Sequence, residues 1–473
     1  MRKISILYIF LSLVLFSGCQ KEDDYHVPDN IKVKDFVWKG MNLYYLWQED
    51  VPNLSDDRFA NQDELNDFLS NQSDPETLFQ NLRVDNTIDR FSVIFSDYRV
   101  LEGVLSGTTE NNGVDFGLRY KAGSSTDIFG WVRYILPGSD ASSKNIHRGD
   151  IFYAVDGIPL TVGNYQSLLA NDTYTLNLAD YDNGNITPNG QSVTLTKGVL
   201  SENPVLLHNV TVSGSHRIGY LMYNGFYPNY EDALNNAFGE LKSQDVTDFV
   251  LDLRYNSGGS IATATHLASM ITGQFTGQLF AKEQWNQKAQ EYFESHDSAG
   301  LNNNFTSQTG SGASINSLNM STVYVLTSRS TASASELIIN CLEPYINVVQ
   351  IGDVTTGKNV GSITLYDSPD FSSQDRNPDH KYAMQPIVLQ VVNKNGFGDY
   401  HTGLIPDHQL LEDLSDLGML GTGSEPLFAT AIGQITGNGR MIKRNPREQA
   451  LHFSDSKSIN KLQNQMYREN FNR

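Results

Sequence analysis

The amino-acid sequence predicts an α/β protein with a small β-rich domain and a helical N-terminal region. Over residues 204–436, β-type runs alternate with apolar-striped helical runs, as in a sheet covered by helices. Residues 105–203 differ, because their short β-type runs are broken by Gly, Asn, Asp and Pro. Residues 31–104 contain mainly helical stripes, and we identify no chemistry in them. Residues 437–473 become basic and polar, and we expect them to form a solvated extension.

Length and composition exclude several classes of protein. A chain of 473 residues has room for about three domains. Its hydrophobic fraction of 39% is sufficient for packed cores, so the chain is not a disordered one. The formal net charge of −20 opposes binding to nucleic acid, because phosphates require a basic protein surface. The sequence contains neither an H-E-x-x-H motif nor a C-x-x-C pair, so we expect no metal and no cofactor.

Residues 1–19 form a targeting segment. A basic start precedes an apolar run over 4–16 that is too short to span a bilayer comfortably, and Ser-Gly-Cys follows at 17–19. This order resembles a bacterial lipoprotein signal peptide, in which Cys19 becomes the lipidated first residue. The resemblance implies a lipid anchor in the outer membrane of the cell envelope, facing the periplasm or the cell surface, with residues 20–30 as a tether. An ordinary secretory peptide is the alternative.

The β-rich region carries turns typical of a small peptide-binding domain. Pro137-Gly138 opens a turn, His147-Arg148-Gly149-Asp150 leads into a β-type run, and Asp156-Gly157 closes it. This pattern resembles a PDZ domain, and Phe116-Gly117-Leu118 stands where such a domain keeps its carboxylate-binding loop. The resemblance implies that Phe116, Gly117 and Leu118 capture an extended peptide at a sheet edge and hold its C-terminal carboxylate. A generic small β domain is the alternative.

A dense group of hydroxyls lies between a β-type run over 322–327 and a helical run over 336–342. The group consists of Ser330, Thr331, Ser333 and Ser335. A strand-to-helix turn presents free backbone N–H groups and favours negative charge, which suits a catalytic nucleophile. Residues 333–336, Ser-Ala-Ser-Glu, also match a capping box, and a serine at a helix start is far more often a cap than a nucleophile. The choice depends on whether the chain supplies a base and an oxyanion site.

Lys358 is the candidate base. It follows a β-type run over 346–351, and a helix with its return strand would bring Lys358 back beside the helix that begins after Ser333. A lysine acts as a base only where its site holds it neutral, and the sequence neighbours of Lys358 carry no charge. Residues 352–358 also satisfy G-x-x-x-x-G-K of a phosphate loop. However, Asn359 replaces the Ser or Thr that binds Mg²⁺, and a strand-like run follows, so we expect no nucleotide.

Residues 251–260, Leu-Asp-Leu-Arg-Tyr-Asn-Ser-Gly-Gly-Ser, predict a strand that runs into a glycine pair and then a helix. Paired glycines let the backbone approach a substrate closely and direct an N–H at a developing oxyanion. Gly258 and Gly259 are therefore candidate donors, with the amide of Ala334 as the second one. On its own, a glycine pair is more often only a turn.

The nucleophile turn, the lysine and the glycine turn together resemble the C-terminal processing peptidases, also called tail-specific proteases. These enzymes use a serine–lysine dyad and carry a PDZ domain before the catalytic core. The resemblance covers about residues 105–430 and implies a serine endopeptidase that cuts protein or peptide substrates near free C-termini. It also implies a crotonase-like, ClpP-like α/β spiral for the core over 204–436.

The resemblance gives each candidate residue a role. It makes Ser333 the nucleophile and Lys358 the base. It makes Gly258 or Gly259, together with Ala334, the oxyanion donors. Family members often place a glutamine four residues after the lysine to orient it. This sequence has Ser362 there, and its hydroxyl is the candidate orienting group.

Two other functions fit parts of the sequence. A Ser-His-Asp hydrolase would use Asp407-His408 as its best pair, but no G-x-S-x-G elbow surrounds any serine. A catalytically inactive, membrane-tethered PDZ scaffold is the alternative from another class, supported only by the missing glutamine. The presence of both Ser333 and Lys358 argues against the scaffold.

Overall fold

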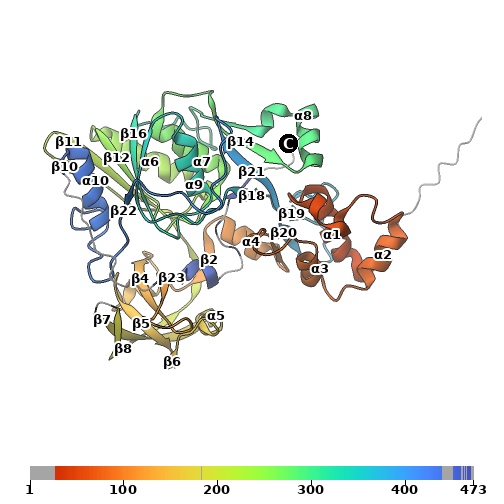
Figure 1. Ribbon diagram of the computed structural model, residues 1–473, viewed down its shortest axis with the longest axis horizontal. Helices are drawn as coiled ribbons and strands as arrows, with labels where there is room; N and C mark the ends of the chain where they lie inside the picture. The colour runs from red at the N-terminus through yellow and green to blue at the C-terminus, as the bar shows by residue number, and fades with distance from the viewer. Residues whose placement is uncertain are drawn as a thin grey trace, which may run out of the picture.

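A computed structural model gives the structure of the chain (Figure 1). It describes residues 27–182, 184–438, 451–459, 462, 464 and 466–469. Cys19, the rest of the predicted signal peptide and most of the tether therefore lie outside the described residues. Within them, no helix combines the length and the hydropathy needed to cross a membrane.

The core of the molecule contains a mostly parallel six-stranded sheet in the order β10-β11-β12-β16-β17-β22. Only the β10–β11 pair is antiparallel. The strands are β10 (Val205–Ser213), β11 (His216–Tyr223), β12 (Asp248–Asp252), β16 (Thr322–Thr327), β17 (Asn347–Gly352) and β22 (His408–Gln409). The helices are α6 (Glu231–Ser243), α7 (Ile261–Thr272), α9 (Ala334–Leu342) and α10 (Pro426–Thr436).

The helices cover both faces of this sheet (Figure 1). Successive strand residues point to opposite faces, so Leu251 and Val325 pack with α6, α7 and α9, whereas Val250 and Leu326 pack with α10. The alternation of strands and helices predicted from the sequence is thereby confirmed, and the fold is mixed α/β. The crotonase-type spiral stays a prediction.

A second six-stranded sheet lies beside the first and has the order β13-β24-β18-β21-β14-β15. Its strands are β13 (Gly259–Ser260), β24 (Met466–Tyr467), β18 (Val360–Ser362), β21 (Ile387–Asn393), β14 (Leu279–Trp285) and β15 (Asn302–Asn304). The N-terminal helices are α1 (Lys32–Tyr44), α2 (Gln62–Ser70), α3 (Pro75–Asn81) and α4 (Tyr98–Leu105), and α8 (Gln287–His296) lies next to α1. A small sheet of β1 (Val93–Phe95), β20 (Ala383–Gln385) and β19 (Leu365–Tyr366) joins the N-terminal region to the core.

The β-rich domain forms a separate body below the core in Figure 1 and has its own hydrophobic centre. Its strands are β3 (Val114–Tyr120), β4 (Ile128–Ile135), β5 (Ile151–Val155), β6 (Ile158–Pro159), β7 (Thr173–Asp182) and β8 (Asn185–Thr196), with helix α5 (Tyr165–Ala170). The antiparallel pair β2 (Thr108–Asn111) and β9 (Gly198–Ser201) connects the domain to the core. A β-rich domain over this region is as predicted, and its identity as a PDZ domain stays a prediction.

The peptide-binding candidates do not lie in a loop. Phe116, Gly117 and Leu118 are inside strand β3, and the side chains of Phe116 and Leu118 are buried in the domain core. The outer edge of β3 is paired antiparallel with β23 (His452–Asp455), a strand from the C-terminal segment. At this edge, the backbone of β3 is therefore paired with the C-terminal segment of the same chain.

The prediction that the chain after residue 437 is a solvated extension is wrong for its described part. Strand β23 pairs with β3, and β24 lies inside the second sheet between β13 and β18. An uncovered strand edge leaves a row of backbone N–H and C=O groups without hydrogen-bond partners. Strands β23 and β24 provide partners for such groups on the strands that they pair with. Strands of four and two residues are too short to show a period in a polar sequence.

Candidate active site

Ser333 stands at the turn between β16 and α9 in a strained backbone conformation. Its φ of 65° and ψ of −116° lie outside the extended region usual for an N-cap residue. The side chain is fully buried. Its Oγ lies toward the Glu336 amide, as in a capping box, but among the described residues it has no hydrogen-bond partner of good geometry. A buried hydroxyl in this state is free to bond to a base or to a substrate.

Lys358 is buried, with an exposed fraction of 1%, and its Nζ lies 4.7 Å from the centre of the Phe91 ring. Burial lowers the pKa of Lys358 from its usual value to about 7, although the carboxylates of Asp89 and Glu336 oppose the shift. The neighbouring Arg90 guanidinium also lowers this pKa. Near neutral pH, a substantial fraction of the amine is therefore unprotonated and able to accept a proton.

The buried carboxylate of Glu336 holds the serine turn and the lysine turn together. Its Oε2 accepts hydrogen bonds from the backbone N–H of Ser333, at 2.7 Å, and of Lys358, at 2.9 Å. Its Oε1 accepts from the N–H of Gly357, at 2.6 Å, and from the hydroxyl of Thr355, at 2.5 Å. Burial raises the pKa of Glu336, and the four hydrogen bonds that its carboxylate accepts oppose this shift.

The glycine turn lies directly beside the serine turn. Strands β12 and β16 are parallel neighbours, so their carboxyl ends emerge at the same sheet edge. The backbone carbonyl of Asn256 accepts hydrogen bonds from the N–H of Ala332 and the hydroxyl of Ser335, both at 3.1 Å. The three turns predicted to carry the chemistry are therefore adjacent in space.

Within the glycine pair, the two amides differ. The N–H of Gly258 donates to Asn256 Oδ1 at 2.8 Å, so it is engaged inside its own turn. Gly259 has a φ of 144°, and a Cβ there would lie 2.3 Å from the carbonyl oxygen of Phe226, so only glycine fits. Ala334 is the first residue of α9, where backbone N–H groups have no acceptor within the helix.

Ser362 lies buried in β18, and its hydroxyl contacts two groups. Its Oγ donates to Gln385 Oε1 at 2.8 Å and lies 3.2 Å from the carbonyl oxygen of Met466. A glutamine side chain is thus present next to this position, contributed by β20. Whether Ser362 orients Lys358 stays a prediction.

Asp407 and His408 occupy structural positions. Asp407 Oδ2 accepts the backbone N–H of Gln350 at 2.8 Å, and His408 pairs with Ile351 in the main sheet. Over the described ranges, no cluster of three or more His, Cys, Asp or Glu side chains could hold a metal ion.

Sequence comparison identifies the family. The pattern that defines peptidase family S41 matches residues 217–372, which include both Ser333 and Lys358, and the pattern of the peptidase S41 N-terminal domain matches residues 32–93. The chain belongs to peptidase family S41. A solved structure from Bacteroides fragilis, described as an S41 protease, is similar to this S41 chain with 28% identity and a TM-score of 0.65. The match covers 86% of this chain and 98% of that one.

Two curated relatives are similar to this S41 chain over shorter stretches. The carboxyl-terminal-processing protease of Picosynechococcus sp. is 24% identical over 345 residues, which cover 72% of this chain and 73% of the relative. The chloroplastic C-terminal processing peptidase of Tetradesmus obliquus is 26% identical over 260 residues, which cover 52% of this chain and 51% of the relative.

Several residues of the site were not predicted from the sequence. Asp89, Arg90 and Phe91 come from the N-terminal S41 domain, in which we identified no chemistry, yet Phe91 covers the Lys358 amine. Arg90 donates from Nη2 to the carbonyl oxygen of Gly357 at 3.1 Å. These contacts join positions 267 residues apart, so no local sequence signal could have shown them.

Proposed function

We propose that the chain is a serine endopeptidase that cleaves polypeptides near their C-termini through a Ser333–Lys358 dyad. The observation that carries the proposal is the shared Glu336 carboxylate, which fixes the backbone of both residues around an unpartnered serine hydroxyl and a buried lysine. Membership of peptidase family S41 supports a peptidase that acts on proteins.

In the proposed mechanism, neutral Lys358 takes the proton of Ser333 Oγ while the oxygen attacks the substrate carbonyl carbon. The N–H groups of Gly259 and Ala334 stabilise the negative charge on the carbonyl oxygen, and the Gly258 amide joins them if its turn rearranges. The Lys358 ammonium then gives its proton to the departing amine, which leaves an acyl-enzyme. Water hydrolyses this ester with Lys358 acting again as the base.

We further propose that substrates are protein or peptide chains with free C-termini, captured by the β-rich domain as an added strand. The names of the curated relatives and the PDZ-like turn pattern support this substrate class. An inactive PDZ scaffold would bind such chains without cutting them.

A serine-directed fluorophosphonate should test the dyad. We expect the probe to attach to Ser333, because an activated hydroxyl reacts and an ordinary N-cap hydroxyl does not. Mass spectrometry of the labelled protein identifies the site. Ser333→Ala should lose the label, whereas Ser335→Ala, a matched change in the same turn, should keep it. Label on another serine, or peptide cleavage that survives in Ser333→Ala, would contradict the proposal, and a chain that binds peptides but neither labels nor cuts would favour the scaffold.

We also propose that the mature chain begins at lipidated Cys19 and is anchored in the outer membrane. The basic, apolar, Ser-Gly-Cys order of residues 1–19 supports this location. The mature protein should partition into detergent, and Cys19→Ser should remain in the aqueous phase. A mature wild-type chain with an unmodified N-terminus would refute the anchor.

A further inference from the structure

The described parts of the C-terminal segment, residues 451–459, 462, 464 and 466–469, occupy two places where an extended peptide would bind. Strand β23 covers the edge of β3, and β24 fills the gap between β13 and β18. Both contacts are made by backbone groups in strand pairing, which is also how a peptide adds to a sheet edge. One described part of the segment thereby lies on the β-rich domain, and another lies beside the glycine turn of the candidate active site.

On the β-rich domain, backbone pairing and the aromatic ring of Phe453 hold the start of the segment. His452 lies opposite Arg119 in the antiparallel ladder, and the N–H of Tyr120 donates to the carbonyl oxygen of Leu451 at 3.0 Å. The ring of Phe453 packs edge-on against Tyr120, with centroids 5.2 Å apart, and against Tyr165, at 5.4 Å. Phe453 therefore fills an aromatic site at this edge.

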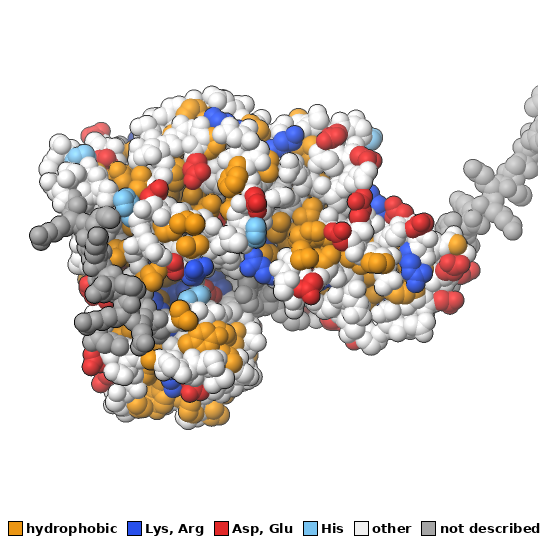
Figure 2. Space-filling model, in the orientation of Figure 1, with side chains coloured by type: hydrophobic (Ala, Val, Ile, Leu, Met, Phe, Trp, Pro, Cys, Tyr) orange, Lys and Arg blue, Asp and Glu red, His pale blue; other side chains and the backbone are white. Residues whose placement is uncertain are grey.

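Asp455 connects this strand to the serine turn. Its Oδ2 accepts hydrogen bonds from Ser330 Oγ, at 2.6 Å, and from Arg133 Nη1, at 3.2 Å. The adjacent groove of about 520 Å³ is lined by three arginines and by His452 of the segment itself. The arginines are Arg119, Arg133 and Arg329. The carboxylates of Asp353 and Glu412 line the same groove. Figure 2 shows Lys and Arg side chains gathered in the recess between the β-rich domain and the core, where Arg133 binds the Asp455 carboxylate of the segment.

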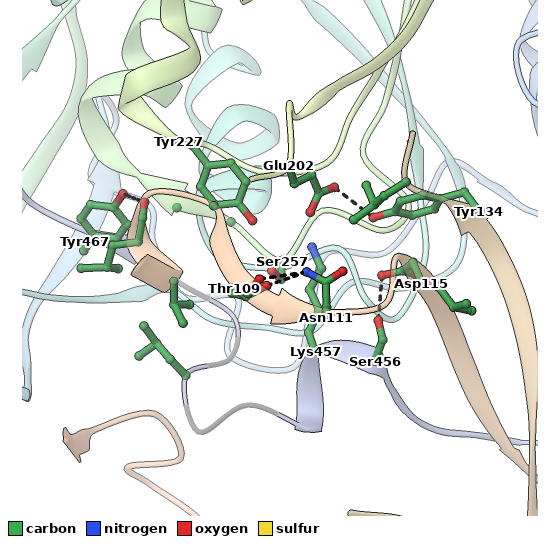
Figure 3. Close-up of a pocket in the computed structure, with 18 residues that line it drawn as sticks. Thr109, Asn111, Asp115, Tyr134, Glu202, Tyr227, Ser257, Ser456, Lys457 and Tyr467 are labelled. Carbon is green, nitrogen blue, oxygen red and sulfur yellow. Dashed lines mark hydrogen bonds between the residues drawn. The ribbon is translucent and has the colours of Figure 1, made fainter. Parts of the chain in front are cut away.

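Beyond Asp455, the segment forms one wall of a cavity of about 120 Å³ next to the glycine turn (Figure 3). Ser456 Oγ donates to Asp115 Oδ2 at 2.7 Å, and Lys457 Nζ donates to the carbonyl oxygen of Asn224 at 3.2 Å. Gly258 and Gly259 also line this cavity. The segment is thus seated where a peptide backbone would approach the candidate oxyanion donors.

Strand β24 then passes between two elements of the candidate site. Met466 pairs in parallel with Gly259, and the N–H of Arg468 donates to the carbonyl oxygen of Ser362 at 3.0 Å. The Arg468 guanidinium donates to Glu283 Oε2 at 2.8 Å, which fixes the end of the segment. A second peptide cannot pair with these strands while β24 is present.

We infer that residues 451–469 are an intramolecular substrate mimic that blocks the peptide path until a substrate displaces it. The inference rests on the proposed function and names the substrate class: extended chains with an aromatic residue two positions before an acidic one, as at Phe453 and Asp455. A tethered strand competes at an effective concentration on the order of millimolar, so a free peptide binds only to the fraction of molecules whose segment has left.

Peptide binding tests the inference without catalysis. The probe is a fluorescent synthetic peptide with the sequence of residues 451–459, Leu-His-Phe-Ser-Asp-Ser-Lys-Ser-Ile, and the protein is the full Ser333→Ala chain. Adding Phe453→Ala should weaken the internal strand and tighten probe binding about tenfold, because the probe brings its own aromatic ring. Tyr292→Ala removes an exposed aromatic ring from α8 and should leave probe binding unchanged.

A reversible disulfide lock between β3 and β23 has the opposite effect to Phe453→Ala, because it keeps the internal strand in place. Cysteines at positions 119 and 452, introduced as Arg119→Cys and His452→Cys, face each other across an antiparallel pair, at a Cα separation of about 4.5–5.5 Å that a disulfide tolerates. Oxidation should abolish probe binding in the Ser333→Ala chain and peptide cleavage in the active one, and reduction should return both to the level of the same cysteine variant before oxidation. His452→Cys alone is the control for oxidation.

The outcomes separate this inference from the proposed function. Tighter probe binding in Phe453→Ala, with loss of binding in the oxidised lock, supports the mimic even if no variant cuts peptide, and in that case the proposed function fails. A Phe453→Ala chain that melts earlier yet binds the probe no better shows a merely structural segment and overturns the inference. Full cleavage in the oxidised lock also overturns it.

Discussion

Replacing Lys358 by arginine is expected to reduce peptide cleavage by about 10²–10⁴-fold, the usual contribution of a positioned general base. Arginine keeps the positive charge and much of the length of the side chain, but its guanidinium does not deprotonate in proteins. Steady-state kinetics on a peptide substrate measure the loss in kcat. Cleavage at the wild-type rate in Lys358→Arg would refute the dyad.

The pH dependence of the wild-type enzyme is part of the same prediction. Because the pKa of Lys358 is about 7, the neutral base disappears as the pH falls below 7, and kcat should rise along a limb centred near that value. Phe91→Ala admits water to the amine, so the pKa should rise and the limb should move to higher pH. A limb that stays in place when Phe91 is removed would show that another group titrates.

The same shift has a consequence for stability. An unfolded lysine has a pKa near 10.4, so between about pH 7 and pH 10 the unfolded chain binds more protons at this position than the folded chain. The contribution of Lys358 to the free energy of unfolding therefore increases as the pH rises through this window. Burial of the Lys358 amine therefore lowers the free energy of unfolding near neutral pH.

The local elements of the catalytic core were predictable from the sequence because their signals are local. The β-branched run at 322–327 is β16, and the apolar spacing after Ser333 is α9. The proximity of Ser333 and Lys358 also follows from the chain, since a helix and its return strand bring the end of β17 back to the start of α9. No such argument placed the glycine turn, which lies beside the serine turn because β12 and β16 are parallel neighbours.

The parts of the fold and of the candidate site that the sequence did not predict depend on contacts between distant segments of the chain. Phe91 comes from a helical region with no catalytic motif, and its role exists only because it packs on Lys358. The four residues of β23 carry mixed polar and aromatic side chains that give no strand period, and the open edge of β3 is what orders them. Glu336 was recognised only as the partner in a capping box, because its bonds to Gly357 and Lys358 require the folded core.

Glu336→Gln is expected to lower kcat by about 10²-fold, since a displacement of about 1 Å in a catalytic group has an effect of that size. An amide nitrogen would replace one carboxylate oxygen, and the two donors that this oxygen accepts would lose their partner, at about 1–3 kcal/mol each. The serine and lysine turns would then no longer be tied to a common atom, and the melting temperature should fall as well.

The pH profile distinguishes this positioning role from a contribution to stability alone. The Glu336 carboxylate raises the pKa of Lys358, so its neutralisation should lower that pKa and move the rising limb of kcat to lower pH. Glu343→Gln, at the exposed end of the same helix, is the matched control and should leave the limb and kcat unchanged. A Glu336→Gln enzyme that melts earlier but keeps the wild-type limb and kcat would show that the carboxylate supports the fold without placing the nucleophile and its base.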